Sequence, residues 1–266
     1  MNQKKEKPTA LLVFTDLDGS LMEHESYSIE PARGALESLF QRHYMVIMNS
    51  SKTAAEMCAV QQQIDLQAPF ICENGAALQL LADGQVKSRR VEFGQPRDQW
   101  LPKVHSLREQ HSFDFSGFAD WSTERISELT GLDRHRAMLA AKREYSEPIL
   151  WRGSTQQKSH FEKLLAAYDL QMLEGGRFLS IQGQHNKSDA MRWLKEHQDS
   201  DDHTLTVALG DSPNDTAMLA AADIAVIIKS AKSDRIQLDG PARVIRTNRP
   251  GPSGWSDAII EILRTV

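Results

Sequence analysis

The chain has 266 residues, of which 40% are hydrophobic and 25% are charged, and this composition excludes a disordered or collagen-like protein. Its 31 Lys and Arg residues against 36 Asp and Glu residues give a formal net charge of −5, so no overall positive field favours nucleic acid or an anionic membrane. The two cysteines, Cys58 and Cys72, form no CxxC pair, which argues against a disulfide framework and a zinc-thiolate site.

The apolar segments are too short for export or membrane insertion. The run Ala10–Phe14 behind the charged N-terminus is shorter than the apolar core of a signal peptide. No stretch approaches the ~20 apolar residues that cross a bilayer. We therefore expect a cytoplasmic protein of one large or two modest domains, without a membrane or nucleic-acid partner. The sequence carries no signal for an oligomeric state.

Strand and helix patterns alternate along the N-terminal part of the chain. Ala10–Thr15 is continuously apolar and β-prone, which favours a strand buried on both faces of a parallel sheet. Pro31 opens a predicted helix, and Val46–Met48 predicts a second strand. A helix from about Thr53 to Ile64 and a strand at Phe70–Cys72 follow. This β-α-β-α-β order is typical of a doubly wound α/β sheet.

The C-terminal part repeats this alternation of strands and helices. Helices are predicted at Ala190–His197, Asp215–Ala222 and Ser256–Leu263, and strands at Leu205–Leu209, Ile224–Ile228 and Arg243–Arg246.

The middle of the chain has a different pattern. Residues 84–185 are more polar, and the alternating stretches Val86–Phe93 and Phe178–Gln182 predict strands of an exposed antiparallel sheet. The simplest arrangement is an α/β core of residues 1–83 and 186–266, a doubly wound parallel sheet, with residues 84–185 inserted as a separate α+β domain.

Two aspartates follow the first predicted strand directly, in FTDLDGSL at residues 14–21. Ligands bind at the carboxyl ends of strands in open α/β sheets, so Asp16 and Asp18 stand where a site is expected. Two close carboxylates repel each other unless a divalent cation compensates. An EF-hand is excluded, because its loop needs Gly at position six and Glu at position twelve, where this chain has Gly19 fourth and Tyr27 twelfth. An Asp-rich turn with a helix cap is the alternative for this motif alone.

A second acidic motif, GDSPND at residues 210–215, follows another apolar strand. Ser212 and Pro213 make a good start for a helix, and Asp215 suits the positive end of its dipole. Capping does not explain Asp211. Four acidic groups at two strand ends therefore predict a magnesium site rather than two independent caps.

Two further features have a phosphate-binding and an ordinary interpretation. Ser50-Ser51-Lys52 follows the second strand, and hydroxyls and free N–H groups at a helix start can cradle a phosphate, although plain N-capping is commoner. Lys187 precedes a predicted helix, where a lone lysine is usually solvated surface. Only its place in the chain, before the strand of the second acidic motif, singles it out.

Taken together, the order DLDGS, SSK, Lys and GDSPND resembles the haloacid dehalogenase (HAD) superfamily. ICENGA at residues 71–76 and the position of the insert, here a cap, resemble its Cof-type branch. Typical members of that branch carry Thr-Gly-Arg where this chain has Ser50-Ser51-Lys52. That variant, with REYSEP at residues 143–148 and GRFL at residues 176–179, is similar to the mannosyl-3-phosphoglycerate phosphatases.

The resemblance implies a HAD-like, Rossmann-like core with a specificity cap and a Mg²⁺-dependent phosphatase acting on a small phosphorylated metabolite. Asp16 would attack phosphorus and form an aspartyl-phosphate, and Asp18 would act first as general acid and then as general base. Mg²⁺ would be held by Asp16, the backbone carbonyl of Asp18 and Asp211. Asp215 would be a further ligand or the partner of Lys187.

The resemblance also implies roles in substrate binding. Ser50 and Lys187 would bind the transferring phosphoryl oxygens, with Asn214 as a further contact. In the cap, Arg143 and Arg177 are candidates for binding a substrate carboxylate in bidentate fashion, although most arginines are solvated surface.

The expected reaction is hydrolysis of mannosyl-3-phosphoglycerate to mannosylglycerate and phosphate. One alternative is a Cof-type hexose-phosphate or sucrose-phosphate phosphatase of broad range, and a phosphomutase of the same fold is another. A non-catalytic sugar-phosphate sensor is a third alternative, but the intact nucleophile argues against it, because a binder has no need of one.

Overall fold

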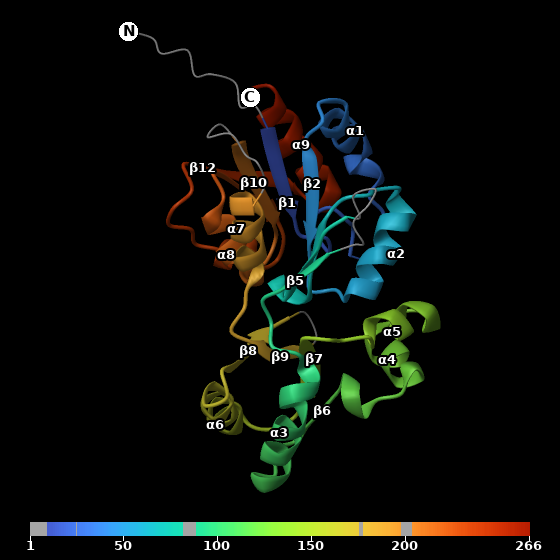
Figure 1. Ribbon diagram of the computed structural model, residues 1–266, viewed down its shortest axis with the longest axis vertical. Coiled ribbons are helices and arrows are strands. Elements are labelled where there is room, and N and C mark those ends of the chain that lie inside the picture. The colour runs from blue at the N-terminus through green and yellow to red at the C-terminus, as the bar shows by residue number, and fades with distance from the viewer. Residues whose placement is uncertain (1–9, 25, 82–88, 176–177, 198–203) are drawn as a thin grey trace.

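The computed structural model describes residues 10–24, 26–81, 89–175, 178–197 and 204–266. In these residues the strands form two sheets, one of eight strands and one of four (Figure 1). In spatial order, the larger sheet contains β12 (Arg243–Pro250), β11 (Ile224–Lys229), β10 (Thr204–Gly210), β1 (Ala10–Thr15), β2 (Met45–Asn49), β3 (Phe70–Cys72), β4 (Ala77–Gln79) and β5 (Arg90–Glu92). Each neighbouring pair from β12 to β3 is parallel. By contrast, β4 pairs antiparallel with β3, and β5 pairs antiparallel with β4.

Helices cover both faces of the larger sheet, which explains the continuous apolar run of its central strand. Leu11 and Val13 of β1 join the apolar cluster on one face, whereas Leu12 and Phe14 join the cluster on the other. The first face packs against α1 (Arg33–Gln41), α2 (Ala54–Ile64) and α9 (Gly251–Leu263), and the second against α7 (Lys187–His197) and α8 (Thr216–Ala221). The predicted doubly wound α/β fold is confirmed.

The smaller sheet and its helices form the cap, at the far end of the molecule from the C-terminus (Figure 1). The sheet is antiparallel and contains, in order, β6 (Phe115–Gly117), β7 (Ser146–Trp151), β9 (Leu179–Gly183) and β8 (Leu170–Glu174). Apolar side chains on one face pack against α3 (Arg97–Gln110) and α6 (Thr155–Ala166). Two shorter helices, α4 (Thr123–Thr130) and α5 (Arg134–Ala140), pack against each other beside this sheet.

One strand expected in the insert belongs to the larger sheet instead. The prediction over Val86–Phe93 was wrong about its sheet: the described part, β5, pairs with β4, and Val91 lies opposite Leu78. The chain reverses direction at a short 3-10 turn, Glu73–Gly75, so β4 and β5 extend the edge of the core as antiparallel strands. The other alternating stretch, Phe178–Gln182, was predicted correctly as an antiparallel strand of the smaller sheet, because β9 occupies its place.

The division into residues 1–83 with 186–266 and residues 84–185 stays a prediction, and the place of β5 in the larger sheet bears on where the insert starts. We propose that the cap begins after Glu92, near Gly94, and that the chain returns to the core before α7. Among the described residues, no helix has both the length and the apolar character needed to cross a membrane.

Candidate active site

Three of the predicted motifs meet at one edge of the larger sheet. The last residue of β1 lies opposite Leu209 of β10 and Met48 of β2. The residues that follow these strands, Asp16, Asp211 and Ser50, therefore share the same edge. This is where ligands bind in open parallel sheets.

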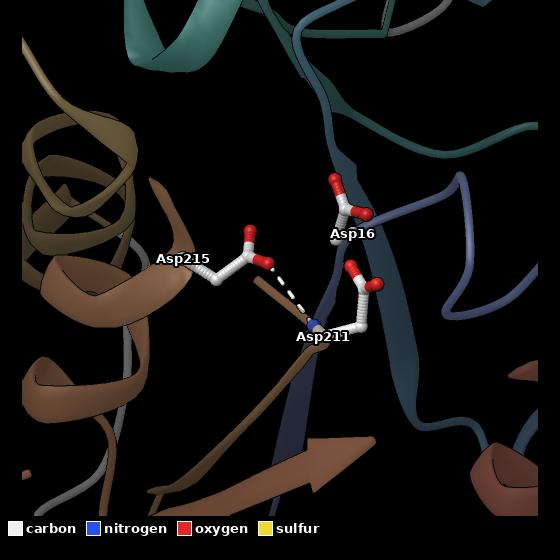
Figure 2. Close-up of side chains that lie close together, drawn as sticks. All are labelled: Asp16, Asp211 and Asp215. Atoms are coloured by element: carbon white, nitrogen blue, oxygen red, sulfur yellow. Dashed lines mark hydrogen bonds between the residues drawn. The ribbon is translucent and has the colours of Figure 1, made fainter. Parts of the chain in front are cut away.

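Three aspartates from the two acidic motifs lie around a common space at this edge (Figure 2). Asp16, Asp211 and Asp215 each offer a carboxylate oxygen within 4.8 Å of the others, and all three side chains are buried. The register of β1 against β10 brings the first two together, and the 3-10 turn before α8 adds the third. Acidic residues that are about 200 positions apart in sequence thus form one cluster.

Lys187, the first residue of α7, supplies the positive charge of this cluster. Its side chain is 1% exposed, and Nζ lies 2.5 Å from Oδ1 of Asp16 and 2.7 Å from Oδ1 of Asp215. Burial, helped by the neighbouring aspartates, raises the pKa of Asp16 to about 8 against the lowering effect of Lys187. Burial acts to lower the pKa of Lys187, but the two aspartates outweigh it and raise that pKa above its ordinary value.

Both carboxylate oxygens of Asp215 have protein partners. Oδ1 accepts from Lys187 Nζ, and Oδ2 accepts from the backbone N–H groups of Asp211 and Ser212, each at 3.1 Å. A Cβ on Gly210 would lie 2.5 Å from Cβ of Asp215, so only glycine allows this close approach. Of the two roles left open by the sequence, the geometry favours Asp215 as the partner that holds Lys187.

The donor set fits a divalent cation. Three buried carboxylates face one ammonium group, which leaves an excess of negative charge where burial is costly. A hard cation with oxygen ligands, such as Mg²⁺, would remove that excess. Asp16 and Asp211 are the residues that would hold it, with the backbone carbonyl of Asp18 as a predicted further ligand.

Asp18 has a partner that the sequence did not predict. Oδ2 lies 2.8 Å from Nζ of Lys52, the last residue of the Ser-Ser-Lys motif, whereas Oδ1 is buried and has no hydrogen-bond partner among the described residues. Burial acts to lower the pKa of Lys52, but Asp18 and Glu56 outweigh it and raise that pKa. The Lys52 ammonium therefore stays charged and orients the Asp18 carboxyl group.

A cavity of about 890 Å³ opens between the core and the cap, and Asp16, Asp18 and Asp211 line its core side. Pro148, Leu173 and Ser180 of the smaller sheet line it, each next to a residue that faces α3 and α6. Because successive strand residues point to opposite faces, the cavity lies against the face of the cap sheet that the helices leave open. Phe118 and Phe178 add aromatic surface. The cavity thus joins a charged floor to a mostly apolar roof.

The family of haloacid dehalogenase-like hydrolases matches residues 13–114 and 153–238, well over half of the chain. The chain belongs to this family. Both acidic motifs, the Ser-Ser-Lys motif and Lys187 lie inside the matched ranges.

Solved structures show the same HAD-like fold. A phosphatase of the HAD superfamily from Bacteroides thetaiotaomicron is similar at a TM-score of 0.69, with 17% identity over 98% of this chain and 97% of its own. A HAD subclass IIB sugar phosphatase gives a TM-score of 0.67, with 17% identity over 95% and 99%. A haloacid dehalogenase-like hydrolase from B. subtilis gives 0.66, with 14% identity over 96% and 99%.

Two predicted phosphate-site residues of this HAD-like hydrolase lie near the acidic cluster. Ser50 is buried, and its Oγ accepts from the backbone N–H of Lys52 at 3.3 Å. Asn214 lines the cavity, and its Oδ1 accepts from the Ser212 hydroxyl at 2.5 Å. Asn214 therefore lies at the cavity, with its amide oxygen already accepting from Ser212, and Ser50 lies at the same sheet edge as Asp16.

Of the two predicted cap arginines, the structure describes Arg143 only. Arg143 lines the cavity, but its guanidinium also donates to the backbone carbonyls of Ser51 at 2.7 Å and Ala140 at 3.0 Å, and lies 3.7 Å from Glu56. Much of its donor capacity therefore connects the cap to the core. Arg177 lies outside the described residues.

His24 is a further cavity residue that the sequence did not single out. Its Nε2 lies 3.9 Å from Oδ2 of Asp211, and this contact is the main cause that raises the pKa of His24. It belongs to the loop that follows β1 and carried no motif of its own. Only its nearness in sequence to Asp18 could have drawn attention to it.

Proposed function

We propose that this HAD-like hydrolase is a Mg²⁺-dependent phosphatase for a small phosphorylated sugar or glycerate ester, with mannosyl-3-phosphoglycerate as the substrate. The observation that carries the proposal is a buried charge cluster below a cavity shared with the cap: Asp16 and Asp211 line the cavity, and Lys187 contacts Asp16. The similarity to a sugar phosphatase of subclass IIB supports the substrate class.

The proposed chemistry begins at Asp16. Its carboxylate oxygen attacks phosphorus, the bond to the leaving alcohol breaks, and the phosphoryl group is transferred to the carboxylate as an acyl phosphate. Asp18 gives its proton to the departing alkoxide, then takes one from the water that hydrolyses the acyl phosphate. Phosphate leaves, and both carboxyl groups return to their starting states.

Other residues bind and orient the phosphoryl group. Lys187 and Ser50 would contact its oxygens, because they flank the Asp16 carboxylate at the same sheet edge. Lys52 would hold Asp18 in place through the 2.8 Å contact between its Nζ and Oδ2. A Mg²⁺ ion bound by Asp16, the Asp18 carbonyl and Asp211 would offset the repulsion between the anionic nucleophile and the anionic phosphate.

The specific substrate rests on the sequence variants in the core motif and the cap. Ser50-Ser51-Lys52 in place of Thr-Gly-Arg, and the REYSEP segment that begins at Arg143, are similar to the mannosyl-3-phosphoglycerate phosphatases. The cavity of about 890 Å³ has room for a glycosylated glycerate. A broad hexose-phosphate phosphatase would use the same core residues with less selectivity in the cap.

A screen of phosphorylated metabolites tests the proposal. We expect Mg²⁺-dependent phosphate release from mannosyl-3-phosphoglycerate at a higher kcat/KM than from mannose 6-phosphate, glucose 6-phosphate or sucrose 6-phosphate. The Asp16→Asn variant is the matched control for contaminating phosphatases. Similar values across the sugar phosphates would favour the broad phosphatase, and no release from any phosphoester would contradict the proposed function.

A further inference from the structure

The turn between β3 and β4 holds a buried glutamate in an unusual conformation. Glu73, Asn74 and Gly75 all have positive φ values, of 46°, 60° and 98°. Such a conformation is costly for a glutamate and persists only when its surroundings fix it. Glu73 is also fully buried, and no Lys, Arg or His nitrogen of the described residues forms an ion pair with it. This carboxylate must therefore be stabilised by hydrogen bonds.

Within the described part of the chain, the side-chain hydrogen bonds of Glu73 all come from the cap. Oε1 accepts from the backbone N–H of Glu144 at 2.9 Å. Oε2 accepts from the backbone N–H of Tyr145 at 3.0 Å and from the hydroxyl of Ser146 at 2.6 Å. These three cap residues lead into and begin β7, a central strand of the cap sheet. We call this set of contacts the Glu73 clamp.

The backbone of the same turn holds the phosphate-binding loop. The N–H of Glu73 donates to the carbonyl of Lys52 at 2.9 Å, and the N–H of Asn74 donates to the carbonyl of Ser50 at 3.0 Å. One turn thus contacts the cap through a side chain and the Ser50–Lys52 segment through its backbone.

The turn also packs against the start of α7. A Cβ on Gly75 would lie 2.0 Å from the carbonyl oxygen of Asn186 and 2.9 Å from the backbone nitrogen of Lys187. His185 Nε2 lies 3.2 Å from the carbonyl oxygen of Glu73. Any shift of the turn therefore reaches the backbone that places the Lys187 ammonium.

We propose that Glu73 is a positioning residue that couples the seating of the cap to the affinity of the phosphate site. If the cap leaves the Glu73 clamp, a buried carboxylate loses its donors, so the clamp favours one arrangement of cap and turn. That arrangement fixes Ser50 and Lys187 through the contacts of the turn. The inference rests on the proposed function, because it takes these residues as ligands of phosphate.

Binding of inorganic phosphate in the presence of Mg²⁺, measured by calorimetry on the full chain, tests this coupling. We expect Glu73→Gln, which offers one acceptor oxygen instead of two, to raise the Kd for phosphate by about fivefold. Ser146→Ala removes one donor from the cap side and should raise Kd by about threefold. The double variant should add little to Glu73→Gln alone, because both changes act through the same contact.

Tyr145→Phe is the matched control. The Tyr145 hydroxyl donates to Oε1 of Glu92 at 2.5 Å, so its removal breaks a contact between the same cap segment and the core that bypasses Glu73. Its Kd for phosphate should stay within about twofold of wild type. Ser146→Ala decides the question if Glu73→Gln does not fold.

The possible results separate the inference from the proposed function. An unchanged Kd in Ser146→Ala and in folded Glu73→Gln would overturn the coupling. An equal rise in Tyr145→Phe would overturn it too, because general loosening of the cap would then explain the effect. If the wild-type chain neither binds phosphate nor hydrolyses p-nitrophenyl phosphate, the proposed function itself is wrong.

Discussion

Asp16 is the residue on which the proposed chemistry depends. We expect Asp16→Asn to lower phosphate release by at least about 10³-fold, because an amide cannot form the acyl phosphate. The fold should persist, since asparagine keeps an oxygen for the Lys187 ammonium, now 2.5 Å from the carboxylate. Release from p-nitrophenyl phosphate and the thermal midpoint measure both effects. A turnover close to wild type would rule out Asp16 as nucleophile.

The two aspartates of the second motif should differ in their effect on metal binding. Asp211→Asn is expected to raise the Kd for Mg²⁺ by about tenfold or more, because it removes a charge that would contact the ion. Asp215→Asn should have a smaller effect, since both oxygens of Asp215 already accept hydrogen bonds from the protein. Calorimetric titration with Mg²⁺ compares the two, and the reverse order would make Asp215 the direct ligand.

Among single residues, the sequence predicted the site residues that directly follow strands. It missed the roles that depend on tertiary contacts. Asp16 and Asp211 could be placed together because parallel strand ends share an edge. The ion pair of Lys52 with Asp18 depends on how two loops fold over that edge, which no local pattern specifies. Glu73 lay in a motif that the sequence had singled out, but its donors belong to the cap.

The start of α2 gives a stability prediction for a single element. Thr53 and Glu56 form a reciprocal capping box, and the Thr53 hydroxyl also donates to the carbonyl of Leu139 in the cap. Thr53→Ala should lower the free energy of unfolding by about 1–2 kcal/mol, measured by urea denaturation. Thr53→Ser, which keeps the hydroxyl, is the control. Equal losses of stability in both variants would show that the methyl group of Thr53, rather than its hydrogen bonds at the helix start, is responsible.

The contacts of Arg143 change what we expect of its removal. The guanidinium holds the backbone of Ser51, next to Ser50. Arg143→Ala should therefore lower kcat/KM by about tenfold for both p-nitrophenyl phosphate and mannosyl-3-phosphoglycerate. Steady-state kinetics on the two substrates provide the test. A loss confined to mannosyl-3-phosphoglycerate would instead support the predicted contact with a substrate carboxylate.

The core elements were predictable because burial on both faces leaves continuous apolar runs that glycine and proline interrupt. For this reason the predicted bounds of two strands, Ala10–Thr15 and Phe70–Cys72, agree with the structure at both ends. The sheet membership of β5 was not predictable, because a short alternating strand fits any sheet with a free edge. The chain reverses at the Glu73–Gly75 turn, so β4 pairs with β3 at the edge of the larger sheet, and β5 then pairs with β4.

For the whole molecule, we expect chelation to abolish activity and Mg²⁺ to stabilise the fold. The excess negative charge of three buried carboxylates should fall when a divalent cation binds. A ligand at 100 times its Kd contributes about 2.7 kcal/mol, so the thermal midpoint should rise by several degrees when Mg²⁺ is added to EDTA-treated protein. Full activity in excess EDTA, or an unchanged midpoint, would contradict a resident metal. Asp211→Asn, which should show a smaller rise, is the control.

The order of the strands has a consequence for how the protein is made. The central strand pairs residue by residue with β10, from Ala10 opposite Thr204 to Thr15 opposite Leu209, although the whole cap lies between them in the chain. A ribosome releases β1 and then all four strands of the cap sheet before it releases β10, and domains fold as they emerge. We expect the nascent chain to carry a folded cap over an unfinished core. The capacity for hydrolysis would then be acquired only after β10 has been released.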